Sequence, residues 1–332
     1  MKRFFILLVA TIFATSISAQ EIKIGIIGLD TSHATAFTQL INSGSEAWAE
    51  GYRVVAAYPY GSRTIESAYK RIPEYSEKVK GFGVEIVGSI EELLSKVDCV
   101  LLETNDGNPH LEQALEVFKA GKPCFIDKPL AATLGQAIAI YELAERYNAK
   151  FFTSSTLRYT PRNQELRAGV EGKVMGADCY SPHTPEPTHP DYGFYGIHGV
   201  ETLYTVMGTG CVAVNRVTTP NEHVVVGEWE DGRIGTFRAF LNGTQIYGGT
   251  IYTDRKKAVP AGGYIGYKDL LKEILQFFKT GKEPISREET LEIFTFMRAA
   301  NLSAKRGGER VTMEEAYHSG EKEAKRLLKE YK

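Results

Sequence analysis

Short apolar runs alternate with segments of helical spacing between residues 22 and 154, and this alternation constrains the possible folds more than any other feature. Six runs are expected to form strands, at residues 22–28, 53–58, 84–87, 99–103, 123–127 and 150–154. Four segments are expected to form helices, at residues 34–43, 89–96, 108–120 and 133–148. Strands that alternate with helices in this way favour a parallel sheet wound on both faces. We therefore predict a doubly wound α/β domain over residues 20–150.

The second half of the chain has a different pattern. Pro, His, Tyr and Gly are frequent over residues 180–198, which predicts a long loop. From residue 212 to 253, β-rich runs are separated by turn signals, and these predict an open antiparallel sheet. Helices are expected again at residues 267–280, 286–306 and 313–331. We predict an α+β domain over residues 151–332 for substrate binding and oligomerisation, with its C-terminal helices packing back on the first domain.

The first 19 residues have the order of a secretory signal peptide. Lys2 and Arg3 precede an apolar run at residues 4–13, and small residues follow up to Ala19. The run is too short to span a bilayer, which needs about 20 residues. An ordinary N-terminal strand or helix is the alternative. We expect a periplasmic or secreted protein without a membrane span, whose mature chain begins near Gln20.

Charge and cysteine spacing exclude two classes of protein. The formal net charge is −2, which offers no basic field for nucleic acid. The four cysteines are widely spaced without a C-x-x-C pair, so a zinc ribbon is excluded. Cys99 and Cys124 lie in apolar runs and are expected to be buried free thiols.

The turn after the first expected strand is where a dinucleotide-binding (Rossmann-type) fold carries the pattern G-x-G-x-x-G. If Gly28 is the first glycine, Asp30 and His33 occupy the second and third positions. The second glycine normally lets the backbone approach a pyrophosphate, and Asp30 puts a negative charge there. The same segment also suits a helix N-terminus capped by Asp30, Thr31 or Ser32. Both interpretations stay open.

The usual acidic residue after the second strand, which would bind the ribose hydroxyls, is missing. Arg63 follows that strand and could meet a 2′-phosphate, although a solvated surface arginine is the simpler interpretation.

Motifs further along the chain resemble the Gfo/Idh/MocA oxidoreductase family. They are Thr104-Asn105, His110, the run Ala120-Gly121-Lys122-Pro123 and the run Asp127-Lys128-Pro129-Leu130. Residues 106–109 lengthen the first of these motifs, and Asp127 replaces a glutamate. The resemblance implies that Lys128 contacts both a sugar and a nicotinamide ring, and that the bond before Pro129 is often cis. It also implies that NAD or NADP contacts Gly28, Asp30, Thr31, Ser32, His33, Thr104, Asn105, His110, Asp127, Lys128 and Pro129.

A second segment, residues 195–201, resembles the part of that family that supplies a catalytic histidine. His198 keeps this position, Glu201 replaces an aspartate, and Phe194 stands where an earlier acid is usual. His198 and Glu201 are one helical turn apart and could face one site, and a histidine can act as a general base near neutral pH. We predict Lys128, His198 and Glu201 as the catalytic residues. The predicted sugar-binding residues are Arg158, Tyr159, His183, His189, Asp191, Tyr195 and His198.

These histidines and carboxylates could instead bind a divalent metal. The spacing of His183 and His189 matches no compact metal motif, so we predict no metal site.

The resemblance implies an exported oxidoreductase that acts on a hydroxyl or keto group of a sugar or polyol with NAD or NADP. Free NAD is scarce outside the cytoplasm, and the phosphate turn is altered. The alternative is therefore a family member that has lost redox function and either binds carbohydrate or catalyses elimination, epimerisation or hydrolysis. The resemblance also implies a homo-oligomer, a dimer or tetramer, formed through the open sheet face at residues 224–229 and 235–241.

Overall fold

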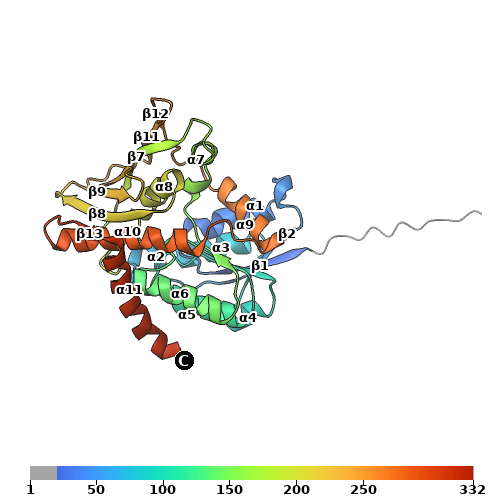
Figure 1. Cartoon of the computed structure of the whole chain (residues 1–332). Helices are drawn as coiled ribbons and strands as arrows, with labels where there is room; N and C mark the ends of the chain where they lie inside the picture. Colours follow the sequence, from blue (N-terminus) through green and yellow to red (C-terminus); the bar gives the residue numbers. More distant parts are fainter. Residues whose placement is uncertain (1–20, 332) are drawn as a thin grey trace, which may run out of the picture.

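The computed structural model describes residues 21–331, which form two sheets with helices around them (Figure 1). The predicted signal segment lies outside these residues. The first sheet has six parallel strands in the order β3-β2-β1-β4-β5-β6. Its strands are β1 (Ile22–Ile27), β2 (Tyr52–Tyr58), β3 (Glu85–Ile86), β4 (Cys99–Leu102), β5 (Cys124–Ile126) and β6 (Phe151–Phe152). The doubly wound α/β prediction is confirmed.

Helices cover both faces of this sheet because its strands are apolar on both sides. One face packs against α4 (Ile90–Leu94), α5 (His110–Lys119) and α6 (Leu134–Arg146). The other face packs against α1 (Ser32–Asn42) and α9 (Lys268–Thr280). The helix α9 comes from the C-terminal part of the chain, and its Phe277 ring lies 5.1 Å from the Phe152 ring of β6. The last strand of the sheet, β6, lies within the run expected at residues 150–154.

The second sheet has seven strands in the order β12-β11-β7-β10-β9-β8-β13. Its pairs are antiparallel except for β7 with β10, which run parallel, so the sheet is mixed and not antiparallel throughout as predicted. The strands are β7 (Val174–Pro182), β8 (Cys211–Thr218), β9 (Glu222–Trp229), β10 (Ile234–Phe240), β11 (Gly248–Thr253), β12 (Lys257–Pro260) and β13 (Val311–Thr312).

Helices α8 (Ile197–Met207) and α10 (Arg287–Lys305) cover one face of the second sheet. Alternate residues of β9 are buried against them, from His223 to Trp229, while those between face outward. The opposite face of the sheet carries no helix within the described chain.

The C-terminal helices join the two layers. Helix α10 runs between the sheets, and α11 (Met313–Leu327) packs on α6 of the first domain (Figure 1). Two glycines allow this close crossing: a Cβ on Gly135 would lie 2.5 Å from Glu323, and one on Gly320 would lie 2.5 Å from Leu134. The remaining helices are α2 (Glu66–Tyr69), α3 (Ile72–Lys80), α7 (Pro161–Arg167) and three 3-10 helices, η1 (Ala47–Ala49), η2 (Thr156–Tyr159) and η3 (Leu328–Tyr331).

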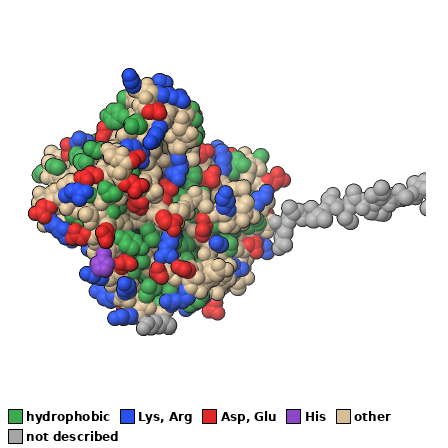
Figure 2. Space-filling model, in the orientation of Figure 1, with side chains coloured by type: hydrophobic (Ala, Val, Ile, Leu, Met, Phe, Trp, Pro, Cys, Tyr) green, Lys and Arg blue, Asp and Glu red, His purple; other side chains and the backbone are tan. Residues whose placement is uncertain are grey.

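Two further expectations concern the membrane and the thiols. Within residues 21–331, no helix is both long and apolar enough to cross a membrane. All four cysteines are buried free thiols, as expected for Cys99 and Cys124. Figure 2 shows acidic and basic side chains interspersed over the visible face, in keeping with the small net charge.

Candidate active site

A pocket of about 260 Å³ lies where the carboxyl ends of the parallel strands meet the second domain. Asn105 follows β4, Lys128 follows β5, and Thr31, Ser32 and His33 follow β1. This edge is where open α/β sheets bind ligands. The second domain and the α9 segment supply the rest of the wall: Thr156, Leu157, Tyr195, His198, Tyr247, Tyr264 and Tyr267, with Arg71 from the first domain.

Lys128 is held at the end of β5, and its ammonium group faces the pocket. The side chain is almost wholly buried, and Nζ lies 5.8 Å from the centre of the Tyr195 ring. The Lys128–Pro129 bond is cis, as the resemblance implied. Because Lys128 and Tyr195 come from different domains, the pocket exists only when the two domains are packed together.

His198 lies in the first turn of α8 and is held by Ser155. The Ser155 hydroxyl lies 2.7 Å from Nδ1 of His198 and also accepts a hydrogen bond from the Leu157 N–H at 3.2 Å. Burial lowers the pKa of His198 well below its ordinary value, and the nearby Lys128 and His33 lower it further. The imidazole is therefore neutral near pH 7 and can accept a proton.

Glu201 supports this arrangement from outside the pocket. Its carboxylate accepts hydrogen bonds from the Ser154 hydroxyl at 2.5 Å, the Ser155 N–H at 2.8 Å and Arg158 Nε at 2.8 Å. Arg158 Nη1 in turn donates to Glu289 at 2.6 Å. With both oxygens engaged, Glu201 is a positioning residue for Ser155 and not a group of the pocket, which corrects its predicted catalytic role.

The turn after β1 has its acidic side chain directed inward. The Asp30 carboxylate accepts hydrogen bonds from the Ser62 N–H at 2.7 Å and the Asn105 N–H at 3.0 Å. Burial raises the pKa of Asp30, although these two amides oppose the shift. Asp30 thus ties three loops together and does not line the pocket. Thr31, not Asp30, caps α1 by accepting from the His33 N–H.

Gly28 is needed because a side chain at this position would collide with the loop after β4. Its φ is +90°, and a Cβ there would lie 2.6 Å from the Thr104 backbone nitrogen. Thr104 donates its hydroxyl to Gln113 at 2.9 Å and does not line the pocket. The glycine therefore serves the packing of β1 against the loop after β4.

His33 and Asp127 are in contact at the base of the pocket. Nδ1 of His33 lies 2.8 Å from Oδ2 of Asp127, and the His33 ring lies 4.5 Å from the Tyr267 ring. Asp127 is fully buried below the pocket surface. Within the described residues, these two and Glu103 are the one group of three whose ligand-type atoms could surround a metal ion, all lying within 4.8 Å of one another.

Three predicted site residues have structural partners that keep them out of the pocket. The ring nitrogens of His110 lie 3.0 Å and 2.9 Å from the carbonyl oxygens of Leu130 and Thr104, and burial lowers its pKa. Arg158 is enclosed by its carboxylate partners, and Tyr159 is packed in the core next to α9. The structure corrects the predicted ligand contacts of these three residues.

The predicted sugar-binding residues His183, His189 and Asp191 line a separate hollow of about 310 Å³. His189 Nε2 accepts from the Gly107 N–H at 3.1 Å, and Asp191 accepts a short hydrogen bond from Asn301. The structure therefore does not bring these three residues together with Lys128 and His198. Of the predicted sugar-binding set, Tyr195 and His198 lie in the pocket.

Several pocket residues were not predicted from the sequence: Arg71, Thr156, Tyr247, Tyr264 and Tyr267. Tyr264 and Tyr267 lie in a glycine-rich segment just before α9, and their rings contact each other at 5.5 Å. Two tyrosines among glycines, just before and at the start of the helix expected at residues 267–280, were the available signal for this wall.

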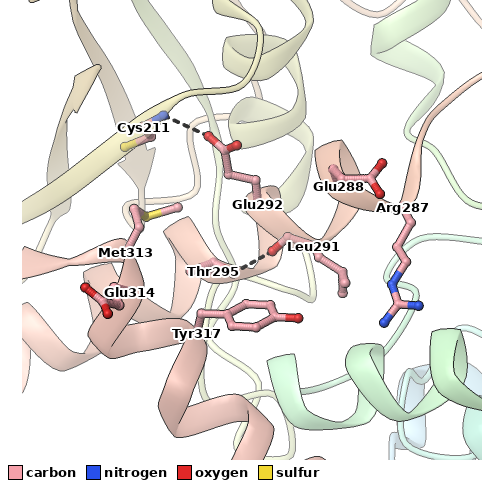
Figure 3. A pocket seen from close by; sticks show the side chains of 9 residues that line it. All are labelled: Cys211, Arg287, Glu288, Leu291, Glu292, Thr295, Met313, Glu314 and Tyr317. Atoms are coloured by element: carbon pink, nitrogen blue, oxygen red, sulfur yellow. Dashed lines mark hydrogen bonds between the residues drawn. The ribbon is translucent and has the colours of Figure 1, made fainter. Parts of the chain in front are cut away.

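A larger hollow of about 470 Å³ lies between α10, α11 and β8 (Figure 3). Figure 3 shows that the Glu292 carboxylate turns toward the Cys211 backbone, from which it accepts a hydrogen bond at 2.8 Å. Its lining includes three glutamates, Glu288, Glu292 and Glu314, but no lysine or histidine within the described chain, so it lacks the Lys128 and His198 pair of the smaller pocket.

Comparisons of sequence are consistent with this geometry. A family model described as an oxidoreductase family with an NAD-binding Rossmann fold, GFO_IDH_MocA, matches residues 22–155. Inositol 2-dehydrogenase of Cereibacter sphaeroides is 32% identical over 127 residues, which are 37% of this chain and 33% of that protein. Dehydrogenase aclE of Aspergillus oryzae is 25% identical over 167 residues, 48% of this chain and 44% of that protein. The chain thus matches less than half of the length of either relative.

Solved structures share the fold over both domains. A probable dehydrogenase from Thermotoga maritima is similar with a TM-score of 0.71 at 20% identity, over 89% of this chain and 100% of that one. Scyllo-inositol dehydrogenase from Lactobacillus casei, with bound NAD(H) and scyllo-inositol, is similar with a TM-score of 0.70 at 15% identity, over 89% of this chain and 100% of that one.

Proposed function

Because this chain belongs to the Gfo/Idh/MocA oxidoreductase family, we propose that it is an enzyme that acts on a hydroxyl or keto group of a sugar or polyol with a nicotinamide cofactor. The observation that carries the proposal is that Lys128 and His198, from different domains, line one pocket. Tyrosine rings and hydroxyl groups make up most of the remaining wall, and these suit the alternating apolar faces and hydroxyls of a sugar.

Lys128 and His198 have complementary tasks in this proposal. The neutral His198 accepts the proton of a substrate hydroxyl, while the ammonium group of Lys128 stabilises the negative charge that develops on its oxygen. Ser155 fixes the orientation of the imidazole through Nδ1, which leaves Nε2 for the substrate. Positioned proton transfer of this kind contributes about 10²–10⁴-fold to a rate.

The residues fit the nicotinamide end of NAD or NADP. Asn105 and Lys128 lie at the carboxyl ends of adjacent strands, and Thr31, Ser32 and Arg71 offer hydroxyls and a cation beside the start of α1. A helix N-terminus with a nearby cation suits a phosphate group. When bound, the nicotinamide ring accepts or donates the hydride. Arg63 pairs with Glu112 at 2.7 Å on the surface, which leaves the choice between NAD and NADP to experiment.

The test uses the purified full chain. Small molecules released on denaturation are identified by mass spectrometry, and thermal midpoints are measured with NAD, NADP and neither. At a ligand concentration of about 100 times Kd, binding adds about 2.7 kcal/mol of stability. Turnover is followed by nicotinamide absorbance with myo-inositol, scyllo-inositol and glucose as probes. Reduction of the cofactor by any of them supports the proposal, and failure of both nucleotides to bind refutes it.

A second function is favoured by the size of the pocket and by Asp30. The volume of about 260 Å³ is below the roughly 300–1,000 Å³ of pockets for drug-sized ligands, so it suits a single sugar ring. The Ser62 and Asn105 amides near the phosphate turn are already taken by Asp30. Carbohydrate binding, or elimination, epimerisation or hydrolysis without a nicotinamide, is therefore the alternative. A thermal shift with a polyol but with neither nucleotide favours it.

We also propose that the protein is exported and forms a homo-oligomer. The export proposal rests on residues 1–19, and N-terminal sequencing of the mature protein tests it, since an intact Met1 refutes it. The oligomer proposal rests on the uncovered face of the second sheet, where Val217, Ile234 and Tyr252 are 64%, 55% and 43% exposed. Light scattering that finds only monomer refutes a dimer or tetramer.

A further inference from the structure

We propose that His33 and Asp127 form a second acid–base unit of the pocket, in which Asp127 holds His33 so that Nε2 serves as a proton acceptor. The inference rests on the proposed function for its substrate class, a sugar or polyol. It adds a proton-handling group on the first domain to His198 on the second.

Both residues depart from the family pattern at this edge of the sheet. His33 replaces the third glycine of the phosphate turn, and Asp127 replaces a glutamate before Lys128. They are 94 positions apart in the chain, yet Nδ1 of His33 and Oδ2 of Asp127 are 2.8 Å apart. A glutamate would carry its carboxylate one methylene further toward the ring. The shorter aspartate leaves room for the imidazole, so the two replacements complement each other.

Burial makes this contact specific. The Asp127 side chain is fully buried, and that of His33 is 7% exposed. Apart from each other, Nδ1 of His33 and the Asp127 oxygens have no polar partner within residues 21–331. Their contact meets the distance of a hydrogen bond but not its alignment, and such contacts commonly tighten when a substrate binds. A buried carboxylate beside Nδ1 favours the proton on that nitrogen, which leaves Nε2 as the acceptor.

Charge is confined to one carboxylate of the cluster. Burial would raise the pKa of Asp127, but the adjacent His33 and Lys128 lower it below its ordinary value. Burial raises the pKa of Glu103 well above its ordinary value, and the charge of Asp127 raises it further. Glu103 is therefore neutral, and Asp127 carries the negative charge that faces His33. This is the charge state that the unit requires.

The ring of His33 lines the pocket together with Lys128 and His198. Tyr267 packs edge-on against this ring, and its hydroxyl lies 3.5 Å from the Ser32 hydroxyl, so the ring is held from the pocket side as well. His33 and His198 approach the ligand from α1 and α8 respectively. Two imidazoles from separate elements suit a substrate with protons on two of its carbons or hydroxyls.

The first test reads the tautomer and needs no substrate. The full chain is labelled with ¹⁵N-histidine, and the His33 signals are assigned by their loss in His33→Gln. We expect the Nδ1–H tautomer in the wild type near neutral pH. In Asp127→Asn the amide can donate to Nδ1, so the Nε2–H tautomer should gain population. A wild-type His33 in the Nε2–H form, or no change in Asp127→Asn, refutes the unit even if the enzyme is active.

The second test reads turnover with the polyol probes. His33→Gln and Asp127→Asn should each lower kcat by about 10²-fold or more, and the double variant should lose no more than His33→Gln alone, because the residues act as one unit. His318→Gln, on an exposed histidine that pairs with Glu321, is the matched control. If Asp127→Asn fails to fold, Asp127→Glu, which keeps the negative charge, is measured in its place. Unchanged turnover in His33→Gln refutes the inference.

The metal content of the purified chain distinguishes the proposed acid–base unit from a metal site built from the same atoms. One equivalent of a divalent cation in the purified chain, absent from Glu103→Gln, would identify a metal site and overturn the proton unit. If no probe is turned over, the proposed function fails, whereas the tautomer measurement still decides whether Asp127 controls His33.

Discussion

Replacing Glu201 by alanine is expected to destabilise this fold more than any comparable change on the surface. The carboxylate accepts three hydrogen bonds, from Ser154, Ser155 and Arg158, and both Glu201 and Arg158 are almost wholly buried. Without it, the Arg158 guanidinium keeps only Glu289, which it shares with Arg167. The variant would therefore leave a buried charge with half of its compensation.

The magnitude follows from that geometry. Removing one partner of a buried ion pair costs about 3–5 kcal/mol. Folded proteins are stable by only about 5–15 kcal/mol, so the loss is a large fraction of the whole. With a urea m-value near 2 kcal/mol per M, the unfolding midpoint should fall by about 1.5–2.5 M. Glu201→Gln keeps an acceptor for the Ser155 N–H but loses the charge, so its midpoint should lie between those of the wild type and Glu201→Ala.

Urea unfolding followed by tryptophan fluorescence measures this change in both domains. Trp229 is buried in β9 of the second sheet, and Trp48 lies in the first domain. Glu315→Ala removes an exposed ion pair with Arg306 and is the matched control, for which a small shift is expected. A midpoint for Glu201→Ala no lower than that of Glu315→Ala would show that the network contributes little and would refute the reasoning.

Three further predictions address the site and the fold. Lys128→Met should lower turnover of the polyol probes by about 10²–10⁴-fold and leave the thermal midpoint unchanged or higher. A variant whose thermal midpoint falls together with its turnover would contradict a role in chemistry. Burial raises the pKa of Asp191 from its ordinary 3.8 to about 6, so its contribution to stability is full below about pH 3.8 and is lost as the pH rises through 6. Asp191→Asn should therefore raise the thermal midpoint near neutral pH but not near pH 4, and equal effects at both would contradict this. Gly28→Ala forces a positive φ and a 2.6 Å approach to Thr104, and should cost about 2 kcal/mol or more in a urea titration, which a wild-type midpoint would disprove.

The first sheet could be predicted because its central strands are buried on both faces and therefore read as short apolar runs. Strands β1 and β2 begin and end within one residue of the expected runs. The second sheet was harder, since β7 mixes exposed, polar and glycine positions. Its parallel partner is β10, and residues paired between them, such as Gly176 and Ile234, are 58 positions apart in the chain. Local sequence does not encode that pairing, so the sheet was expected to be antiparallel throughout.

The site was predictable where a motif fixed both the residue and its place in the fold. Lys128 and His198 were found in this way, and the structure places both in one pocket. Helical spacing put Glu201 on the same side as His198, but it could not show that Arg158 would take the carboxylate. Tyr264 and Tyr267 were missed because their place depends on how the segment before α9 folds over α1, which only tertiary contacts determine.

The packing of α9 on the first sheet has a consequence for what counts as a separable part of this protein. Leu270, Ile274 and Phe277 of α9 share a core with residues of β1 and β6. A fragment that stopped at residue 152 would leave the part of that sheet face under α9 exposed, so it should aggregate when expressed alone. The first domain is therefore discontinuous in sequence, because the chain leaves it after β6 and returns to it with α9. A shuffled or truncated version needs the C-terminal segment to fold.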